Sequence, residues 1–323
     1  MYILGIDLGG TNIAIGLCNE NLEIVDKDSV PTRAEREGEE IVRDMAELCK
    51  TLVKRNGLSE KDIARVGIAT PGSIDDVRGI VEYSNNIKMK DFPIVEIFKK
   101  YFPADRVYVA NDANAAALAE DLAGAAKGSR VSLMITLGTG VGGGVIMDHK
   151  IYAGSANSGG TELGHTVICA RGRQCSCGRR GCFEAYASAT ALTQMTKEKM
   201  EELSIKGIPS ALFEVAEKEG KVSARTAFDA MRLGDAHGKS LVDDYIFYLA
   251  EGVTNMINIF QPDVLTIGGG VCNEKDYLML PLLAHVEREQ YTRNNKNKTK
   301  ILIAALKNDA GIIGAAGLGA ENA

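Results

Sequence analysis

The sequence contains no tryptophan, only seven prolines and four histidines, and no apolar run of about 18 residues. Without such a run, a membrane-spanning helix is not expected. Acidic residues outnumber basic ones by 43 to 37, which gives a formal net charge of −6. This balance disfavours a nucleic-acid partner, because such proteins usually concentrate a basic surplus on one face. The chain opens on a strand-like segment in place of a cleavable signal, so we expect a cytoplasmic protein.

At 323 residues the chain exceeds the usual size of a single hydrophobic core, and two domains are expected. Its seven cysteines are unevenly distributed. Cys18, Cys49 and Cys272 lie in strand-like or helical patterns, which is typical of small buried hydrophobic residues. The other four fall between residues 169 and 182. In a reducing compartment, a cluster of that kind indicates a metal site rather than disulfides.

Strand-like and helix-like segments alternate along the chain. Apolar and β-branched residues interrupted by glycines predict two strands joined by a tight turn over residues 2–17, and helical spacing predicts a helix over 39–53. Further expected elements are strands at 65–69, 107–110 and 264–267, and helices beginning near 112, over 239–260 and over 309–320. This alternation predicts an α/β fold with a mixed sheet.

An internal repeat indicates that the fold is duplicated. Residues 6–17 and 135–146 align without gaps, and both consist of a strand, a turn of small residues and a second strand. We therefore expect each domain to open with its own version of one hairpin. The predicted domains are 1–114 with about 309–323, and 115–308.

The two glycine turns are candidate phosphate-binding sites. Gly9, Gly10, Thr11 and Asn12 form the first turn, and Gly138, Thr139 and Gly140 form the second. Small side chains let backbone N–H groups approach an anion closely. Taken singly, each turn fits an ordinary hairpin turn better than a binding site. As a pair, with Asp7 at the end of the first strand, they favour a phosphate clamp in which Asp7 holds Mg²⁺ through water.

Asn111 and Asp112 stand at a predicted strand-to-helix junction. An Asp at this place is often only the N-cap of the helix. The functional alternative is that Asp112 orients an attacking hydroxyl and accepts its proton late in phosphoryl transfer. A carboxylate with a pKa of about 4 cannot deprotonate a free alcohol outright, so alignment matters more than basicity.

The most specific feature of the sequence is a candidate zinc site. His165 is followed by Cys175, Cys177 and Cys182, with glycines where a short loop must turn around a metal, whereas Cys169 is off this spacing. One imidazole and three thiolates form a closed Cys₃His set, which is typical of structural Zn²⁺. The same loop carries Glu162 and Glu184. These carboxylates are either surface charges or an acceptor pair for neighbouring sugar hydroxyls.

With these residues in view, the chain resembles the ROK family of bacterial sugar kinases and repressors. The resemblance covers nearly the whole chain, and its most specific part is the Cys-x-Cys-Gly-x-x-Gly-Cys-x-Glu pattern from Cys175 to Glu184, preceded by Glu-x-Gly-His at Glu162. It implies an actin-like ATPase (ribonuclease H-like) fold, with two α/β domains flanking a catalytic cleft. Family members often carry a Trp shortly after the position of Asn86, and this chain has none.

The resemblance also implies roles for individual residues. Asp112 matches the catalytic base. The sugar-binding positions are Gly72, Asn86, Asn111, Asp112, Glu162, His165 and Glu184. The positions that hold ATP are Asp7, Gly9, Gly10, Thr11, Asn12, Gly138, Thr139 and Gly140 for the phosphates and Gly268, Gly269 and Gly270 near the adenosine. His165 carries two roles at once, as a zinc ligand through one ring nitrogen and a sugar contact through the other.

The expected activity is transfer of the ATP γ-phosphate to the 6-hydroxyl of glucose, with Mg²⁺ and a structural Zn²⁺. Kinases for N-acetylmannosamine, N-acetylglucosamine, allose or fructose are alternatives, as is a sugar-sensing repressor without catalysis. The repressor alternative is disfavoured, because family repressors carry a helix-turn-helix ahead of the first hairpin, which begins here at residue 2. The family also implies a homodimer or a dimer of dimers.

Overall fold

The computed structural model describes residues 1–154 and 161–320. The chain divides into two compact units, and the division falls within strands β9 (Val131–Leu137) and β10 (Val141–Met147). Unit 1 comprises Met1–Met134, Gly144–Thr161 and Ala304–Ala323, and unit 2 comprises Ile135–Gly143 and Glu162–Ile303. The expected boundary near residue 114 lies inside unit 1. As an assignment of functional domains, that boundary stays a prediction.

A mixed five-stranded sheet forms the centre of unit 1, with the order β3-β2-β1-β4-β8. The strands are β1 (Tyr2–Leu8), β2 (Asn12–Cys18), β3 (Ile24–Pro31), β4 (Ile63–Thr70) and β8 (Val107–Asn111). β1, β2 and β3 pair antiparallel, whereas β4 runs parallel to both β1 and β8. The predicted opening hairpin is confirmed.

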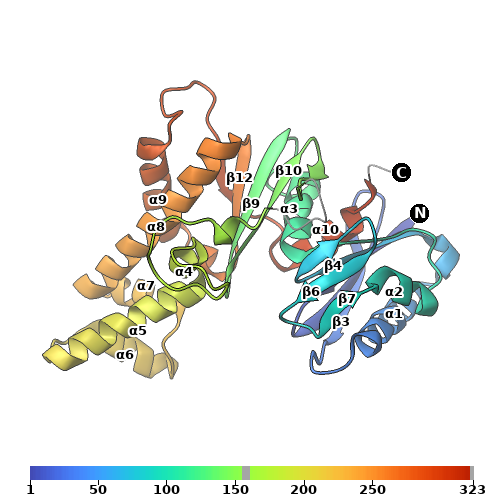
Figure 1. The fold of residues 1–323 in the computed structure, drawn as a ribbon, viewed down its shortest axis with the longest axis horizontal. Coiled ribbons are helices and arrows are strands. Elements are labelled where there is room, and N and C mark those ends of the chain that lie inside the picture. Colours follow the sequence, from blue (N-terminus) through green and yellow to red (C-terminus); the bar gives the residue numbers. More distant parts are fainter. Residues whose placement is uncertain (155–160, 321–323) are drawn as a thin grey trace. The chain divides into compact units, whose positions relative to one another are not determined.

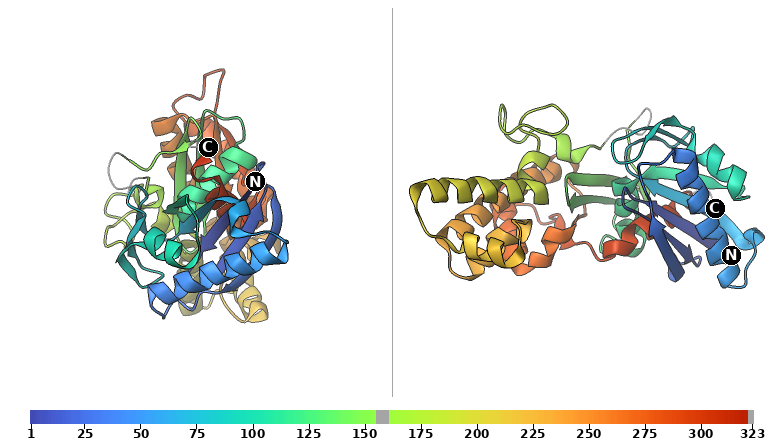
Figure 2. Two further views of the ribbon diagram at one scale, coloured as in Figure 1. Left: turned by 90° about the vertical axis from the view of Figure 1, so that its right-hand side faces the viewer. Right: turned by 90° about the horizontal axis from the view of Figure 1, so that it is seen from below.

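Helices cover both faces of this sheet (Figures 1 and 2). On one face, alternate residues of β1 such as Leu4 and Ile6 form a large apolar cluster with α1 (Gly38–Arg55) and α2 (Ile94–Tyr101). On the other face lie α3 (Asp112–Ala123) and α10 (Ala310–Gly317). The alternation of β1 side chains between faces thus directs one set of residues toward α1 and the other toward α10.

The last helix, α10, packs unusually close to the strands. A Cβ built on Gly67 of β4 would lie 1.7 Å from the carbonyl oxygen of Ala315, and one on Gly5 of β1 would lie 2.0 Å from that of Ile312. Glycine is required at both positions because any side chain would displace the helix. The C-terminal segment therefore completes unit 1 and lies directly against the strand that carries Asp7.

A small antiparallel sheet between β4 and α2 was not predicted from the sequence. Its order is β5 (Ser73–Asp75), β6 (Ile80–Ser84) and β7 (Met89–Phe92). β5 and β7 have only three and four residues, and charged residues interrupt the alternating pattern of the sheet. The sheet places Asn86 in the turn between β6 and β7.

The second five-stranded sheet has the order β11-β10-β9-β12-β13, which repeats the arrangement of the first. Its remaining strands are β11 (Lys150–Ile151), β12 (Val264–Gly268) and β13 (Lys300–Ile303). In each sheet, the third strand of the repeat pairs with the second strand of the hairpin. Two later strands lie on the side of the hairpin's first strand. This repetition agrees with the internal repeat seen in the sequence.

Unit 2 also contains a group of packed helices, drawn in yellow and orange in Figure 2. They are α4 (Glu184–Ala187), α5 (Ala189–Lys206), α6 (Ala211–Glu219), α7 (Ala224–Arg232), α8 (Ala236–Phe260) and α9 (Asp276–Glu289). Short 3-10 helices occur at η1 (Glu60–Asp62), η2 (Leu163–His165), η3 (Gly270–Glu274) and η4 (Lys307–Asp309). None of the described helices is long and apolar enough to cross a membrane.

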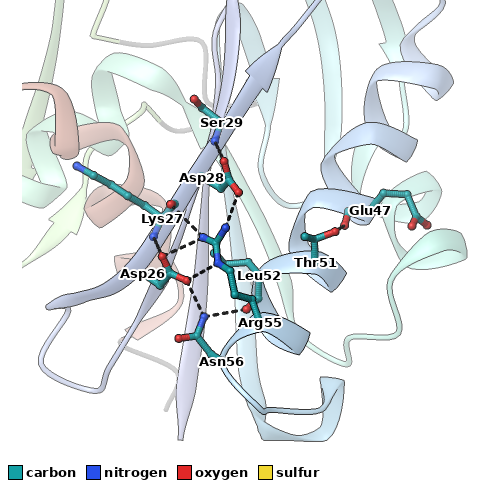
Figure 3. A network of polar contacts seen from close by, with 9 residues as sticks. All are labelled: Asp26, Lys27, Asp28, Ser29, Glu47, Thr51, Leu52, Arg55 and Asn56. Carbon is teal, nitrogen blue, oxygen red and sulfur yellow. Dashed lines mark hydrogen bonds and ion pairs between the residues drawn. The ribbon is translucent and has the colours of Figure 1, made fainter.

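A polar network joins the edge strand β3 to the end of α1 (Figure 3). Arg55 donates to both carboxylate oxygens of Asp26 at 2.8 and 2.9 Å and to Asp28 at 2.8 Å, while Asn56 donates to Asp26 at 2.8 Å. These charges lie on an exposed sheet edge, where they discourage pairing with another strand. The network therefore fixes β3, whose last residue, Pro31, pairs with Asn12 of the first glycine turn.

Candidate active site

The first glycine turn joins β1 to β2 in unit 1. The N–H of Gly9 donates to the carbonyl oxygen of Asn12 at 2.9 Å, which closes the turn. A Cβ built on Gly10 would lie 3.4 Å from the Cβ of Asn86, so the turn between β6 and β7 lies against the first hairpin. A predicted phosphate-binding residue and a predicted sugar-binding residue are thus neighbours within one unit.

Unit 1 contains two carboxyl groups with raised pKa values, Asp7 and Asp112. Burial, and then the negative charge of Asp112, raise the pKa of Asp7 to about 6. Burial likewise raises the pKa of Asp112, although hydrogen bonds from backbone N–H groups and from Asn111 oppose the shift. Perturbed acids of this kind concentrate at functional sites, and nearby like charges are relieved when a cation binds between them. The pair therefore fits the predicted Mg²⁺ and proton-acceptor roles.

The structure distinguishes the roles of Asn111 and Asp112. Asn111 is the N-cap of α3, because its Oδ1 accepts hydrogen bonds from the N–H groups of Ala113 at 3.0 Å and Asn114 at 3.2 Å. Its Nδ2 donates to the carbonyl oxygen of Gly72 at 3.1 Å. Asp112 is the first residue of the helix itself. The simple N-cap interpretation of Asp112 is therefore wrong, although its Oδ1 also accepts a hydrogen bond from the N–H of Ala113 at 2.8 Å.

The predicted zinc ligands lie together in unit 2. The donor atoms of His165, Cys175, Cys177 and Cys182 all lie within 4.8 Å of one another. The Sγ atoms of Cys177 and Cys182 are 3.7 Å apart, and Cys175 Sγ is 3.7 Å from His165 Nδ1. A tetrahedral zinc with Zn–S bonds of about 2.3 Å requires sulfur atoms about 3.8 Å apart. The donor set and its spacing therefore fit Zn²⁺.

Two glycines shape the loop that carries these ligands. Gly178 and Gly181 have φ values of +89° and +85°, which most other residues avoid. A Cβ on Gly181 would also lie 1.8 Å from the carbonyl oxygen of Cys169. The prediction that glycines turn the loop around the metal is consistent with these conformations. Cys169 contributes a backbone contact here and is not one of the four clustered donors.

The end of the zinc loop is attached to the second glycine turn. Glu184 Oε2 accepts a hydrogen bond from the N–H of Val141 at 3.0 Å, and Oε1 accepts one from Ser176 at 3.0 Å. The N–H of Ala189 donates to the carbonyl oxygen of Gly138 at 2.9 Å. A Cβ on Gly140 would lie 2.2 Å from Glu184 Oε2. The predicted sugar-binding carboxylate therefore also supports the predicted phosphate-binding hairpin.

The glycine run at the end of β12 lies beside the same hairpin. Gly269 has a φ of +96°, and a Cβ there would lie 2.2 Å from the carbonyl oxygen of Leu137, the last residue of β9. The predicted adenosine turn and the predicted phosphate turn thus meet backbone to backbone. Only glycine permits this approach.

The predicted site residues fall into one group in each unit. Unit 1 contains Asp7, Gly9, Gly10, Thr11, Asn12, Gly72, Asn86, Asn111 and Asp112. Unit 2 contains Gly138, Thr139, Gly140, Glu162, His165, Cys175, Cys177, Cys182, Glu184, Gly268, Gly269 and Gly270. Three further residues that contact these groups were not predicted from the sequence: Thr32, Ser176 and Val141. A threonine that follows a strand and a valine that begins one carry no distinctive sequence pattern.

Two sheets of one strand order, each with a glycine-turned hairpin, define a protein of the actin-like ATPase fold. The sequence signature described as "ROK family" matches residues 3–322, and this chain belongs to that family. A glucokinase of Halalkalibacterium halodurans is 35% identical over 97% of this chain and 93% of its own.

Solved structures agree with this assignment. A ROK hexokinase from Thermus thermophilus has a TM-score of 0.82 and 32% identity, covering 100% of both chains. A ROK family glucokinase from Streptomyces griseus, solved with glucose and AMPPNP, has a TM-score of 0.79 and 29% identity, covering 99% of this chain and 100% of its own. The predicted family and fold are confirmed.

Proposed function

We propose that this chain is a hexose kinase that transfers the γ-phosphate of ATP to the 6-hydroxyl of glucose, forming glucose 6-phosphate. The observation that carries the proposal is its similarity, over nearly the full length, to proteins named glucokinase and to one solved with glucose and an ATP analogue. The geometry of each unit is compatible with this activity.

Asp112 is the proposed catalytic residue. Burial raises its pKa above the ordinary value, which makes the carboxylate a better proton acceptor than an exposed one. The Asp112 carboxylate nevertheless remains a far weaker base than an alkoxide. Its main contribution is therefore to orient the sugar hydroxyl and to accept its proton late, as the O6–Pγ bond forms and the bond from Pγ to the leaving ADP breaks. Asn111 fixes the start of α3 and so fixes the position of Asp112.

The remaining predicted residues take binding roles in this proposal. Gly72, Asn86, Asn111, Glu162, His165 and Glu184 bind the sugar together with Asp112. The two glycine turns hold the ATP phosphates through backbone N–H groups, and Gly268, Gly269 and Gly270 lie near the adenosine. Asp7 would hold Mg²⁺ through water, and Mg²⁺ bound with ATP would neutralise phosphate charge.

The zinc site has a structural role in this proposal. His165, Cys175, Cys177 and Cys182 would supply four protein ligands, which leaves no open position for a reacting water. Because Glu184 lies two residues after Cys182 and also binds Val141, zinc would stabilise both the sugar-binding loop and the second hairpin. We also propose a cytoplasmic homodimer or dimer of dimers, without a nucleic-acid or membrane partner, on the basis of the family resemblance and the acidic composition.

A phosphotransfer assay over a panel of hexoses tests the substrate. Glucose, fructose, allose, N-acetylmannosamine and N-acetylglucosamine would each be offered with ATP, ADP or polyphosphate. We expect the highest kcat/KM for glucose with ATP. A higher value for another hexose would reassign the substrate, and absence of transfer to every sugar would reject the kinase.

A further inference from the structure

Thr32 follows β3 directly and is completely buried. Its hydroxyl donates a hydrogen bond to the carbonyl oxygen of Gly9 at 2.6 Å, and its backbone N–H donates to the carbonyl oxygen of Thr11 at 2.8 Å. One residue therefore binds two carbonyl groups of the first glycine turn. The bond to Gly9 depends on the side chain, whereas the bond to Thr11 would survive its substitution.

These two bonds determine the direction of the neighbouring N–H groups. In a trans peptide unit the C=O and N–H point to opposite sides. The carbonyl of Gly9 shares its peptide unit with the N–H of Gly10, and the carbonyl of Thr11 shares its unit with the N–H of Asn12. Because both carbonyls point toward Thr32, both N–H groups point away from it. Backbone N–H groups that point to one side of a turn can bind an anion there.

Thr32 is itself anchored to a helix of the core. Its carbonyl oxygen accepts a hydrogen bond from Arg36 Nη2 at 3.0 Å, and the same nitrogen forms an ion pair with Asp44 of α1 at 2.6 Å. Since α1 packs on the sheet through a continuous apolar face, Thr32 is held from outside the turn. The orientation of the turn thus depends on contacts that exist before any ligand binds.

We propose that Thr32 is a positioning residue for the nucleotide phosphates, acting by orienting the N–H groups of Gly10 and Asn12. The proposal rests on the proposed function, in which the turn from Gly9 to Asn12 binds ATP. It adds a buried side chain that does not itself touch the nucleotide. Without the hydroxyl, the carbonyl of Gly9 would lose a partner, and the peptide unit between Gly9 and Gly10 would be held less firmly.

Thr32→Val and Thr32→Ser separate this role from simple packing. Valine preserves the shape and removes the hydroxyl, whereas serine keeps the hydroxyl. Thr196→Val is the matched control, because Thr196 is equally buried and its hydroxyl donates to the carbonyl of Leu192 at 2.8 Å, within α5. The Kd of AMPPNP with Mg²⁺ would be measured by calorimetry, together with KM for ATP and for glucose.

We expect Thr32→Val to raise the Kd of AMPPNP and the KM for ATP about tenfold, with a change of less than about threefold in the KM for glucose. Thr32→Ser should restore nucleotide binding to within about threefold, and Thr196→Val should leave it unchanged. The proposal would be overturned if Thr32→Val left the Kd of AMPPNP unchanged, or if it raised the KM for ATP and the KM for glucose equally. It would also be overturned if Thr32→Ser bound AMPPNP as weakly as Thr32→Val. Failure of the unaltered protein to bind AMPPNP would instead reject the proposed function.

Discussion

The carboxylate of Glu184 accepts a hydrogen bond from the backbone N–H of Val141 at 3.0 Å. This bond connects the end of the zinc loop to the residue that follows the second glycine turn. Glu184 is also a proposed sugar ligand, whereas Glu162, the other proposed carboxylate of the loop, is exposed. The two glutamates should therefore behave differently when they are removed.

We predict that Glu184→Ala and Glu162→Ala both raise the KM for glucose, by about tenfold or more, because each loses hydrogen bonds to a charged acceptor. Only Glu184→Ala should also raise the KM for ATP, since the N–H of Val141 then loses its acceptor and the hairpin loosens. Steady-state kinetics with both substrates varied provides the measurement. Equal ATP KM values in the two variants would show that the bond to Val141 is irrelevant to nucleotide binding.

Gly138→Ala tests the second glycine turn without disturbing the fold. A Cβ on Gly138 would meet no atom of the described residues within 4 Å, and its φ is not positive. We therefore predict an unchanged or slightly higher Tm. The Kd of AMPPNP should rise at least about tenfold, because the methyl group occupies space that a phosphate approaches. Unchanged nucleotide affinity would mean that this turn does not bind phosphate.

Metal analysis should find one zinc per chain, and chelation should release it. We expect zinc removal to lower the Tm and raise the Kd for glucose before it affects the Kd for AMPPNP, since the ligands belong to the loop that carries Glu162 and Glu184. Cys177→Ser should reproduce the loss, whereas Cys169→Ser, outside the donor set, should retain the metal. If metal analysis found well under one zinc per chain in the unaltered protein, the proposed zinc site would be wrong.

Asp235 provides a stability test remote from the proposed site. It is the N-cap of α8, and its carboxylate accepts hydrogen bonds from the N–H groups of Gly238 at 2.7 Å and Ala211 at 2.8 Å. We predict that Asp235→Ala lowers the free energy of unfolding by about 1–2 kcal/mol at neutral pH. The exposed Asp243, paired with Lys239 on the surface of α8, is the control, and Asp243→Ala should change the Tm very little.

This stabilisation should depend on pH. Burial opposes ionisation of Asp235, but the N–H donors outweigh it and lower the pKa of its carboxyl group. A lowered pKa in the folded state stabilises the fold above the unfolded pKa of about 4, and the effect is lost as the pH falls through the folded value. The difference in Tm between Asp235→Ala and the unaltered protein should therefore shrink below about pH 4. A constant difference at all pH values would contradict the role of the charged cap.

The sequence was sufficient to predict the family, the opening hairpin and the clustering of His165, Cys175, Cys177 and Cys182, because these depend on residue types at fixed local spacing. It could not distinguish Asn111 from Asp112 as the N-cap, since both residues favour that position. It also did not reveal the bonds of Thr32 and Glu184 to the two glycine turns. Those bonds join segments far apart in the chain, and neither donor nor acceptor leaves a local pattern. The short sheet containing β6 escaped prediction for lack of regular alternation.

Asp112 is proposed to accept the proton of the sugar hydroxyl during phosphoryl transfer. Its most direct test is the kcat of Asp112→Asn with glucose and ATP, measured alongside the Kd for glucose. Because Asn111 remains the N-cap and asparagine preserves the size of the side chain, the fold and most of the sugar affinity should persist. We predict a fall in kcat of about 10²- to 10⁴-fold, with a Kd for glucose changed by less than about tenfold. Near-normal turnover in Asp112→Asn would contradict it.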